Sequence, residues 1–145
     1  MIDWHKFFTS INVLIFQKTN GRLGNRMGRQ SVLLLHTIGR KSEKSYVNSL
    51  SYYREGINYL VVASNWGKET DPDWFTNLMQ HPQTLIQVGV NEIEVDTHQA
   101  EGEDYRRLWE LVTEKNAQYL HYQKDINRQI PIVVLTPITS ERAIK

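Results

Sequence analysis

The sequence has no cysteine among its 145 residues, and its longest apolar runs are only a few residues long. The lack of cysteine excludes a disulfide framework, a thiolate metal site and a cysteine nucleophile. Short apolar runs such as residues 32–35 exclude a hydrophobic span of a bilayer, and no secretory leader is evident. These absences predict a cytoplasmic chain, and its length is enough for one domain with a buried core.

Familiar catalytic and metal-binding patterns are missing as well. The five histidines are scattered without HExxH or i, i+4 pairing, and neither a GxSxG elbow nor P-loop spacing occurs. Glu92, Glu94 and Asp96 alternate along one predicted strand, where a solvent-facing side is their simplest role. We therefore predict no metal site and no catalytic nucleophile or acid–base pair.

Charge is unevenly distributed, although the net charge is only +1. Residues 1–48 carry +6 and residues 49–145 carry −5. Within the basic part, adjacent Arg40 and Lys41, the Ser42 hydroxyl and loose backbone amides suit a phosphate or carboxylate group. The alternative is a solvated basic turn. The acidic remainder argues against a nucleic-acid partner.

Apolar alternation and turn residues predict six short strands, at 31–37, 45–53, 57–64, 84–88, 93–99 and 130–136. Helices are expected over 3–17, after Asp71-Pro72 and over 102–114, whereas 116–123 is expected to be irregular. Two hairpins favour an antiparallel barrel that carries helices over a parallel sheet. The predicted fold class is thus α+β and mostly β, with an N-terminal helix and basic loop (1–30), a barrel domain (31–137) and a flexible tail (138–145).

A second candidate site feature follows the third predicted strand. That strand ends in the small polar residues 63–65, and the next helix begins with Trp74 and Phe75. Together they could form a pocket wall, with the free amides of the helix start facing an anion. The alternative is that Trp74 and Leu78 form the core face of a short helix.

The predicted N-terminal helix has an apolar face that includes Trp4, Phe7 and Ile11. This face could cap the barrel, contact a second subunit or touch a membrane surface. Its few basic residues favour capping or dimer burial over peripheral membrane attachment.

Several segments, taken in order, resemble one family. Leu33–Ser42 is similar to "LLTTTGRKSG", Tyr59–Gly67 to "yvVvASkgG" and Pro72–Pro82 to "hPaWyhNLkanP". The closing residues 119–123 and 128–137 are similar to "YadYq…tdReIPVvvLeP". These motifs are those of the deazaflavin-dependent nitroreductase (quinone reductase) family, and they run from about Ser31 to Pro137.

This resemblance implies a six-stranded, FMN-binding-like split β-barrel, often a homodimer, that binds coenzyme F-420 in a groove. The implied enzyme is an oxidoreductase that passes a hydride from the deazaflavin to a small quinone or nitroaromatic acceptor, the cofactor performing the redox step. FMN is the alternative cofactor. The alternative function is a non-catalytic split-barrel protein that binds a lipid or a cofactor-like ligand.

Cofactor-binding positions can be carried over from the matching motifs. The tail and phosphate would meet Arg40, Lys41 and Ser42, and the remaining positions would line the groove or flank the ring: Val47, Asn48, Leu50, Ala63, Ser64, Asn65, Trp74, Phe75, Asn77 and Tyr119.

The sequence also departs from the family pattern near these positions. Glu43 replaces a glycine, Tyr46 replaces a basic residue, and Asn65-Trp66 replace Lys-Gly. Each lost cation removes charge-assisted contacts worth roughly 1.5–3 kcal/mol. Basic residues at 22, 26 and 29 are available to compensate.

Overall fold

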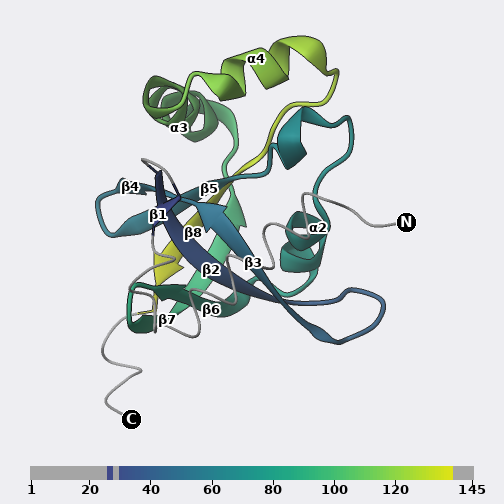
Figure 1. Cartoon of the computed structure of the whole chain (residues 1–145), viewed down its shortest axis with the longest axis vertical. Coiled ribbons are helices and arrows are strands. Elements are labelled where there is room, and N and C mark those ends of the chain that lie inside the picture. The colour runs from purple at the N-terminus through teal and green to yellow at the C-terminus, as the bar shows by residue number, and fades with distance from the viewer. Residues whose placement is uncertain (1–25, 28–29, 139–145) are drawn as a thin grey trace.

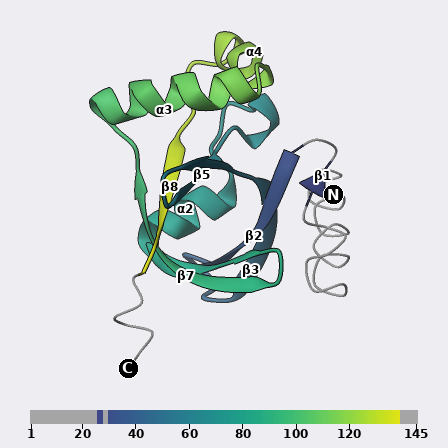
Figure 2. The ribbon, with the colours of Figure 1, turned by 90° about the vertical axis from the view of Figure 1, so that its left-hand side faces the viewer.

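The strands form one curled antiparallel sheet with helices on both sides of its wall (Figures 1 and 2). The computed structural model describes residues 26–27 and 30–138. Its strands are β1 (Arg26–Met27), β2 (Gln30–Ile38), β3 (Ser45–Ser51), β4 (Tyr53–Glu55), β5 (Asn58–Val62), β6 (Gln83–Val88), β7 (Asn91–Gln99) and β8 (Ile132–Pro137). Its helices are the 3-10 turn η1 (Asn65–Gly67), α2 (Asp73–Gln80), α3 (Gly102–Lys115) and α4 (Gln118–Asp125).

A bend at Tyr52 closes the sheet into a barrel. The strand order is β1-β2-β6-β7-β8-β5-β4, and β3 pairs with β2. Ser51 at the end of β3 pairs with Val32, whereas Tyr53 at the start of β4 pairs with Leu60 of β5. The chain thus passes at one residue from pairing with β2 to pairing with β5. This step connects the two ends of the strand order. The predicted antiparallel, α+β split barrel is confirmed.

Two details of the predicted elements were wrong. Six strands were expected, but the described residues hold eight strand segments, because the run 45–53 divides at Tyr52 and the two-residue β1 lies in the basic loop. The stretch 116–123, expected to be irregular, contains most of α4. Only Tyr119 of α4 is buried, so the sequence has no amphipathic pattern to reveal this helix. The predicted helix 3–17 lies outside the described residues.

Two apolar clusters lie on opposite faces of β5 and β8. The barrel interior holds Val61 and Ala63, with Trp74, Phe75 and Leu78 of α2 packed against them. On the outer face, the alternate β5 residues and those of β8 pack against α3 and α4: Leu60, Val62, Ile132, Val134, Leu108, Val112 and Tyr119. The turn η1, which follows β5, therefore lies between α2 and α4.

The β2–β3 turn has one residue in a left-handed conformation. The Gly39 amide donates to the Lys44 carbonyl at 2.8 Å, and the Glu43 amide donates to the Gly39 carbonyl at 2.9 Å. Glu43 has φ 59°, a region in which a side chain costs roughly 1–2 kcal/mol. The family pattern has glycine, which adopts this conformation without that cost, at this position.

We expect Glu43→Gly to raise the free energy of unfolding by about 1 kcal/mol, because glycine adopts φ > 0 without this cost. Lys41→Gly is the matched control, since Lys41 is exposed in the same turn but has no positive φ. That substitution should lower stability by about 0.5 kcal/mol. Urea denaturation measures both changes, and equal effects of the two glycines would contradict this account.

Candidate functional site

The β2–β3 turn, which carries the basic residues, is anchored to the middle and the first residue of α2. Both the backbone amide and the guanidinium of Arg40 donate to the Asn77 side-chain oxygen, at 3.1 and 2.8 Å. The guanidinium also pairs with Asp73 at 3.4 Å. Arg40 and Asn77, proposed from separate motifs, are thus in direct contact. Asn77 is buried, so the hydrogen bonds between the turn and α2 are shielded from solvent on the Asn77 side.

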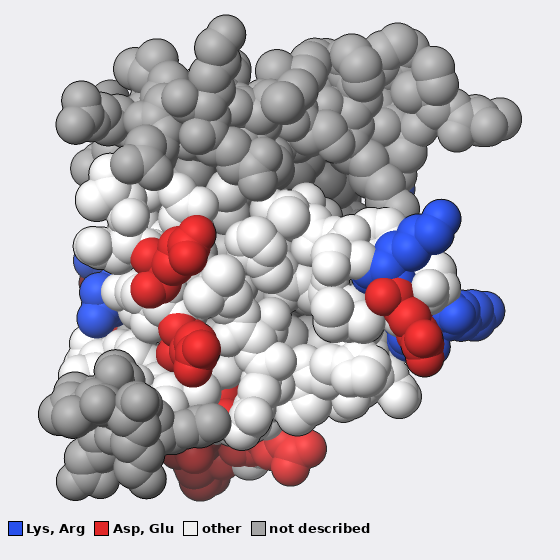
Figure 3. Space-filling view, turned by 90° about the horizontal axis from the view of Figure 1, so that it is seen from below, with Lys and Arg blue, Asp and Glu red and all other residues white. Residues whose placement is uncertain are grey.

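The rest of the turn is exposed and of mixed charge. Lys41 and Lys44 reach solvent, and the Ser42 hydroxyl lies 3.0 Å from the Tyr46 hydroxyl. Figure 3 shows basic side chains with an acidic one among them at the right-hand edge, where the β2–β3 turn projects in Figure 1. The turn can attract an anion, but Glu43 and Asp73 lower its positive potential.

The β3 residues face two directions. Asn48 pairs with Leu35, and Leu50 with Leu33, so both share the interior side of the barrel. Val47 pairs with His36 and points to the other side, because successive residues of a strand alternate. Asn48 and Leu50 can therefore line the same surface as α2, and Val47 cannot.

The interior side near the turn holds an unsatisfied polar group. The Thr37 hydroxyl is buried and has no hydrogen-bond partner among the described residues. Thr37 lies on β2 two residues before Gly39, on the face that carries Leu33 and Leu35. A buried hydroxyl of this kind is a ready partner for a polar ligand group.

The loop after β5 carries three successive left-handed residues. Asn65, Trp66 and Gly67 have φ values of 50°, 60° and 80°. Asparagine tolerates this conformation, and the Asn65 amide group donates to the Thr70 carbonyl at 2.8 Å. Ala63 just before the loop is fully buried in the barrel interior. The change from lysine to Asn65 therefore has a local structural reason.

Tyr119 lies in the outer cluster, away from Trp74 and Phe75. Its hydroxyl is 3.0 Å from that of Tyr53, and the two rings meet edge-on. Burial, together with the neighbouring Tyr53, raises the pKa of Tyr119 well above its usual range, so its phenol stays neutral. The α4 residue that touches the loop is instead Tyr122: a Cβ placed on Gly67 would lie 2.6 Å from its ring.

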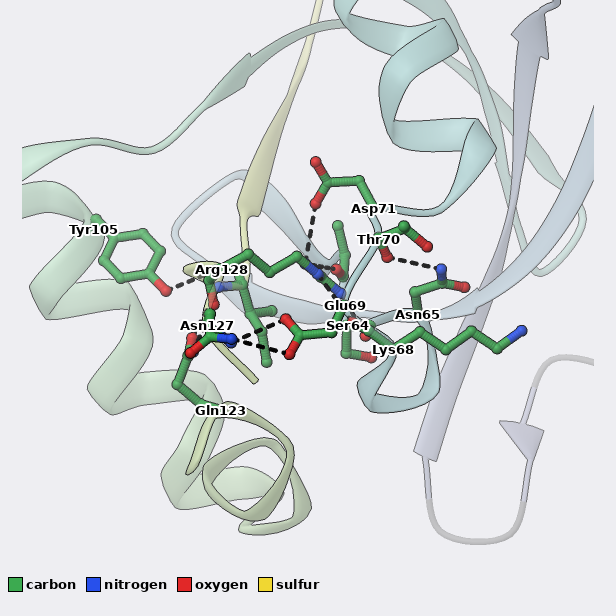
Figure 4. A network of polar contacts seen from close by, with 12 residues as sticks. Ser64, Asn65, Lys68, Glu69, Thr70, Asp71, Tyr105, Gln123, Asn127 and Arg128 are labelled. Atoms are coloured by element: carbon green, nitrogen blue, oxygen red, sulfur yellow. Dashed lines mark hydrogen bonds and ion pairs between the residues drawn. The ribbon is translucent and has the colours of Figure 1, made fainter. Parts of the chain in front are cut away.

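Arg128 was not expected to shape the site, yet its guanidinium holds the loop in place (Figure 4). It donates to the carbonyls of Ala63, Ser64 and Lys68 at 3.2, 2.9 and 3.0 Å. It also pairs with Asp71 at 3.0 Å. These partners lie 57 to 65 residues away in sequence and are mostly backbone carbonyls, so no spacing pattern could reveal them.

Two shallow hollows of about 410 and 420 Å³ lie around Tyr105 and Trp109 of α3. None of the predicted cofactor residues lines either hollow. Over residues 26–27 and 30–138, no cluster of three or more histidines and carboxylates is placed to hold a metal ion. Within the same ranges, no helix combines the length and hydropathy needed to cross a membrane.

Comparisons with known proteins show the family to which the chain is related. Residues 9–137 match the family model described as F420H(2)-dependent quinone reductase. An F420H(2)-dependent quinone reductase of Mycobacterium tuberculosis is 44% identical over 126 residues, which cover 84% of this chain and 85% of that protein.

Solved structures are similar as well. One described as an F420-H2 dependent reductase has a TM-score of 0.66 and 30% identity, covering 72% of this chain and 92% of its own. Another, described as a domain-swapped dimer, has a TM-score of 0.69 and 25% identity, covering 90% and 98%.

We expect Arg128→Lys to loosen the loop after β5, because an ammonium group cannot reproduce the planar guanidinium fork. The Gly67 and Lys68 amides, which close η1, should exchange with solvent about tenfold faster or more. Arg107→Lys is the control, since Arg107 pairs with Glu55 and Asp104 on the surface. Equal loop exchange in the two variants, measured by NMR, would refute the role of Arg128.

Proposed function

Because the chain belongs to the F420H(2)-dependent quinone reductase family, we propose that its β2–β3 turn and the neighbouring interior surface hold the cofactor of that reaction. The chain is an oxidoreductase that transfers a hydride from reduced coenzyme F-420 to quinone acceptors. The observation that supports this placement is the contact of Arg40 with Asn77, which joins the β2–β3 turn to the middle of α2.

The residues present fit an anionic, ring-bearing cofactor. Arg40, Lys41 and Lys44 offer cationic donors at the turn, and the unpartnered Thr37 hydroxyl lies two residues before it. On the interior side, Leu50 is partly buried against a cluster that contains Ala63, Trp74 and Phe75. A charged edge beside an apolar surface suits a molecule with an anionic tail and a flat ring system.

Each part of this surface would have a separate task. F-420, when bound in its reduced form, supplies the hydride. Lys41 and Lys44 attract the anionic groups, and Arg40 holds the turn to α2. The apolar side chains near the interior exclude water from the ring and orient one of its faces. The Tyr119 phenol stays neutral and supports α4 from the outer cluster.

A second copy of the chain is also part of the proposal. The likeness to a structure described as a domain-swapped dimer supports homodimer formation. Nitroaromatic acceptors, a cytoplasmic location and membrane contact through helix 3–17 stay predictions from the sequence. The family membership favours the enzyme over the alternative of a non-catalytic lipid-binding barrel.

Titration of the purified chain with F-420, followed by tryptophan fluorescence, tests the cofactor. We expect saturable binding in the micromolar range, and oxidation of reduced F-420 when a quinone is added. A parallel titration with FMN tests the alternative cofactor. Binding of FMN alone, or of neither molecule, would contradict the proposal.

Charge variants test the placement at the turn. Lys41→Gln should weaken F-420 binding about two- to fivefold at low salt, the range for exposed charge pairs. Asp73→Asn should tighten it by a similar factor, because the carboxylate no longer competes for Arg40. Lys115→Gln is the control, since Lys115 lies on α3 at the other end of the molecule (Figure 1). An equal dissociation constant for the Lys41 and Lys115 variants would refute this placement.

A further inference from the structure

The outer face of β2 carries apolar side chains that belong to neither of the two apolar clusters. Leu33 and Leu35 point into the barrel interior, so Val32 and Leu34 point the other way, because successive strand residues alternate. Both outward side chains are nevertheless fully buried. His36, the next residue on this face, is half-buried, and burial lowers the pKa of its imidazole. The outer side of β2 is therefore covered rather than open to solvent.

The described helices lie on other surfaces of the sheet. Helix α2 lies inside the curve of the sheet, where Trp74 and Leu78 pack against interior residues. Helices α3 and α4 lie above the barrel and pack against the outer face of β5 and β8 (Figure 2). The buried outer face of β2 therefore needs another part of the chain to cover it.

The neighbouring strand β3 indicates which kind of segment fits this face. Ser51 and Ser49 are the β3 partners of Val32 and Leu34. Val47 also lies on the outer side and continues the apolar surface toward the β2–β3 turn. Because serine side chains are small, large side chains of a covering segment can pack beside Val32 and Leu34 at the density of a protein interior.

Residues 3–17 have the pattern and the length that this face requires. Their apolar residues recur at three- and four-residue spacing and are mostly large: Trp4, Phe7, Phe8, Ile11, Leu14 and Ile15. A helix over this range would be about 22 Å long at its usual rise per residue. Residues 32–38 of β2 span about 20 Å as an extended strand. The two surfaces therefore match in length and in the size of their side chains.

The chain also brings this segment to the outer face of β2. Strand β1 pairs with Gln30 and Ser31, directly before Val32. Residues 18–25 join the segment to β1 and can extend over as much as about 26 Å. The C-terminal residues 139–145 follow Ile138, which bonds to β7, and they contain only two apolar residues. Residues 3–17 are therefore the better candidate for the cover.

We propose that residues 3–17 form an amphipathic helix that packs on the outer face of β2 and β3 of the same chain. Its large apolar side chains cover Val32 and Leu34 and lie beside the small Ser49 and Ser51. This packing supports from outside the hairpin whose turn carries Arg40. It also makes the apolar side of the segment unavailable to a membrane surface or a second copy. The proposal does not depend on the redox activity of the chain.

Paramagnetic broadening of amide NMR signals in the whole chain tests this packing. Because the chain has no cysteine, Thr9→Cys accepts a nitroxide label at one position, opposite the apolar residues of the predicted helix. We expect the label to broaden the amide signals of Leu34 and Ser49 strongly and those of Leu108 and Val112 in α3 much less. Sharp signals in β2 and β3, or equal broadening in α3, would overturn the proposal.

Two matched substitutions in the labelled chain test whether the apolar side of the segment makes the contact. Ile11 lies on that side, whereas Val13 lies on the opposite side at 3.6 residues per turn. Ile11→Asp should remove most of the broadening of Leu34, because burying an unpaired carboxylate is costly. Val13→Asp should leave the broadening in place. Equal loss in both variants, or no loss in either, contradicts the proposed packing.

Two further samples identify other occupants of this face. In the first, isotope-labelled chain without nitroxide is mixed with nitroxide-labelled chain, and the signals of Leu34 and Ser49 should stay sharp. Broadening there means that a second copy supplies the segment, which overturns the proposal. In the second, the chain is sedimented with phosphatidylglycerol vesicles and should stay in the supernatant. Sedimentation that Ile11→Asp abolishes means that the apolar side binds lipid instead, which also overturns it.

Discussion

The guanidinium of Arg128 lies between the segment that leads into β8 and the loop after β5, where it donates to three backbone carbonyls and pairs with Asp71. Its side chain is only 15% exposed, so these bonds form with little competition from water. The loop backbone is left-handed at three successive residues, and such a conformation needs this external support. The positions of Ser64, Asn65 and Trp66 all depend on it.

The same loop links two sides of the barrel wall. Alternate side chains of β5 point into the barrel interior and toward α3 and α4. Both apolar clusters therefore include residues of the strand that leads into η1. Trp74 and Phe75 complete the interior, whereas Tyr119 supports α4 outside it. The candidate site is therefore the edge at which the interior surface, the η1 loop and the β2–β3 turn meet, rather than a closed cavity.

The positive charge of the β2–β3 turn is partly offset by nearby carboxylates. Three cationic side chains share the region with Glu43 and Asp73, and Arg40 is engaged by Asn77 and Asp73. Such an arrangement favours an extended anion while limiting nonspecific attraction. Glu43 and Trp66 both stand where the family pattern has glycine, and both keep a positive φ. The chain thus places side chains at two left-handed positions where the family pattern has none.

Period-two alternation and turn residues were enough to predict the antiparallel barrel, because each strand buries one or both of its faces. Arg40 and Lys41 followed from the basic turn, and Asn77 followed from the family resemblance. The partner change at Tyr52 could not be predicted, since barrel closure depends on strands far apart in sequence. α4 was missed because only one of its side chains is buried. The opposite directions of Val47 and Asn48, the outer placement of Tyr119 and the Arg128 contacts depend on register and on backbone carbonyls. Residue types therefore indicated the fold class and an anion site, and the family resemblance indicated the cofactor. Only tertiary structure decided which side chains share a surface, because that depends on how distant backbones pack together.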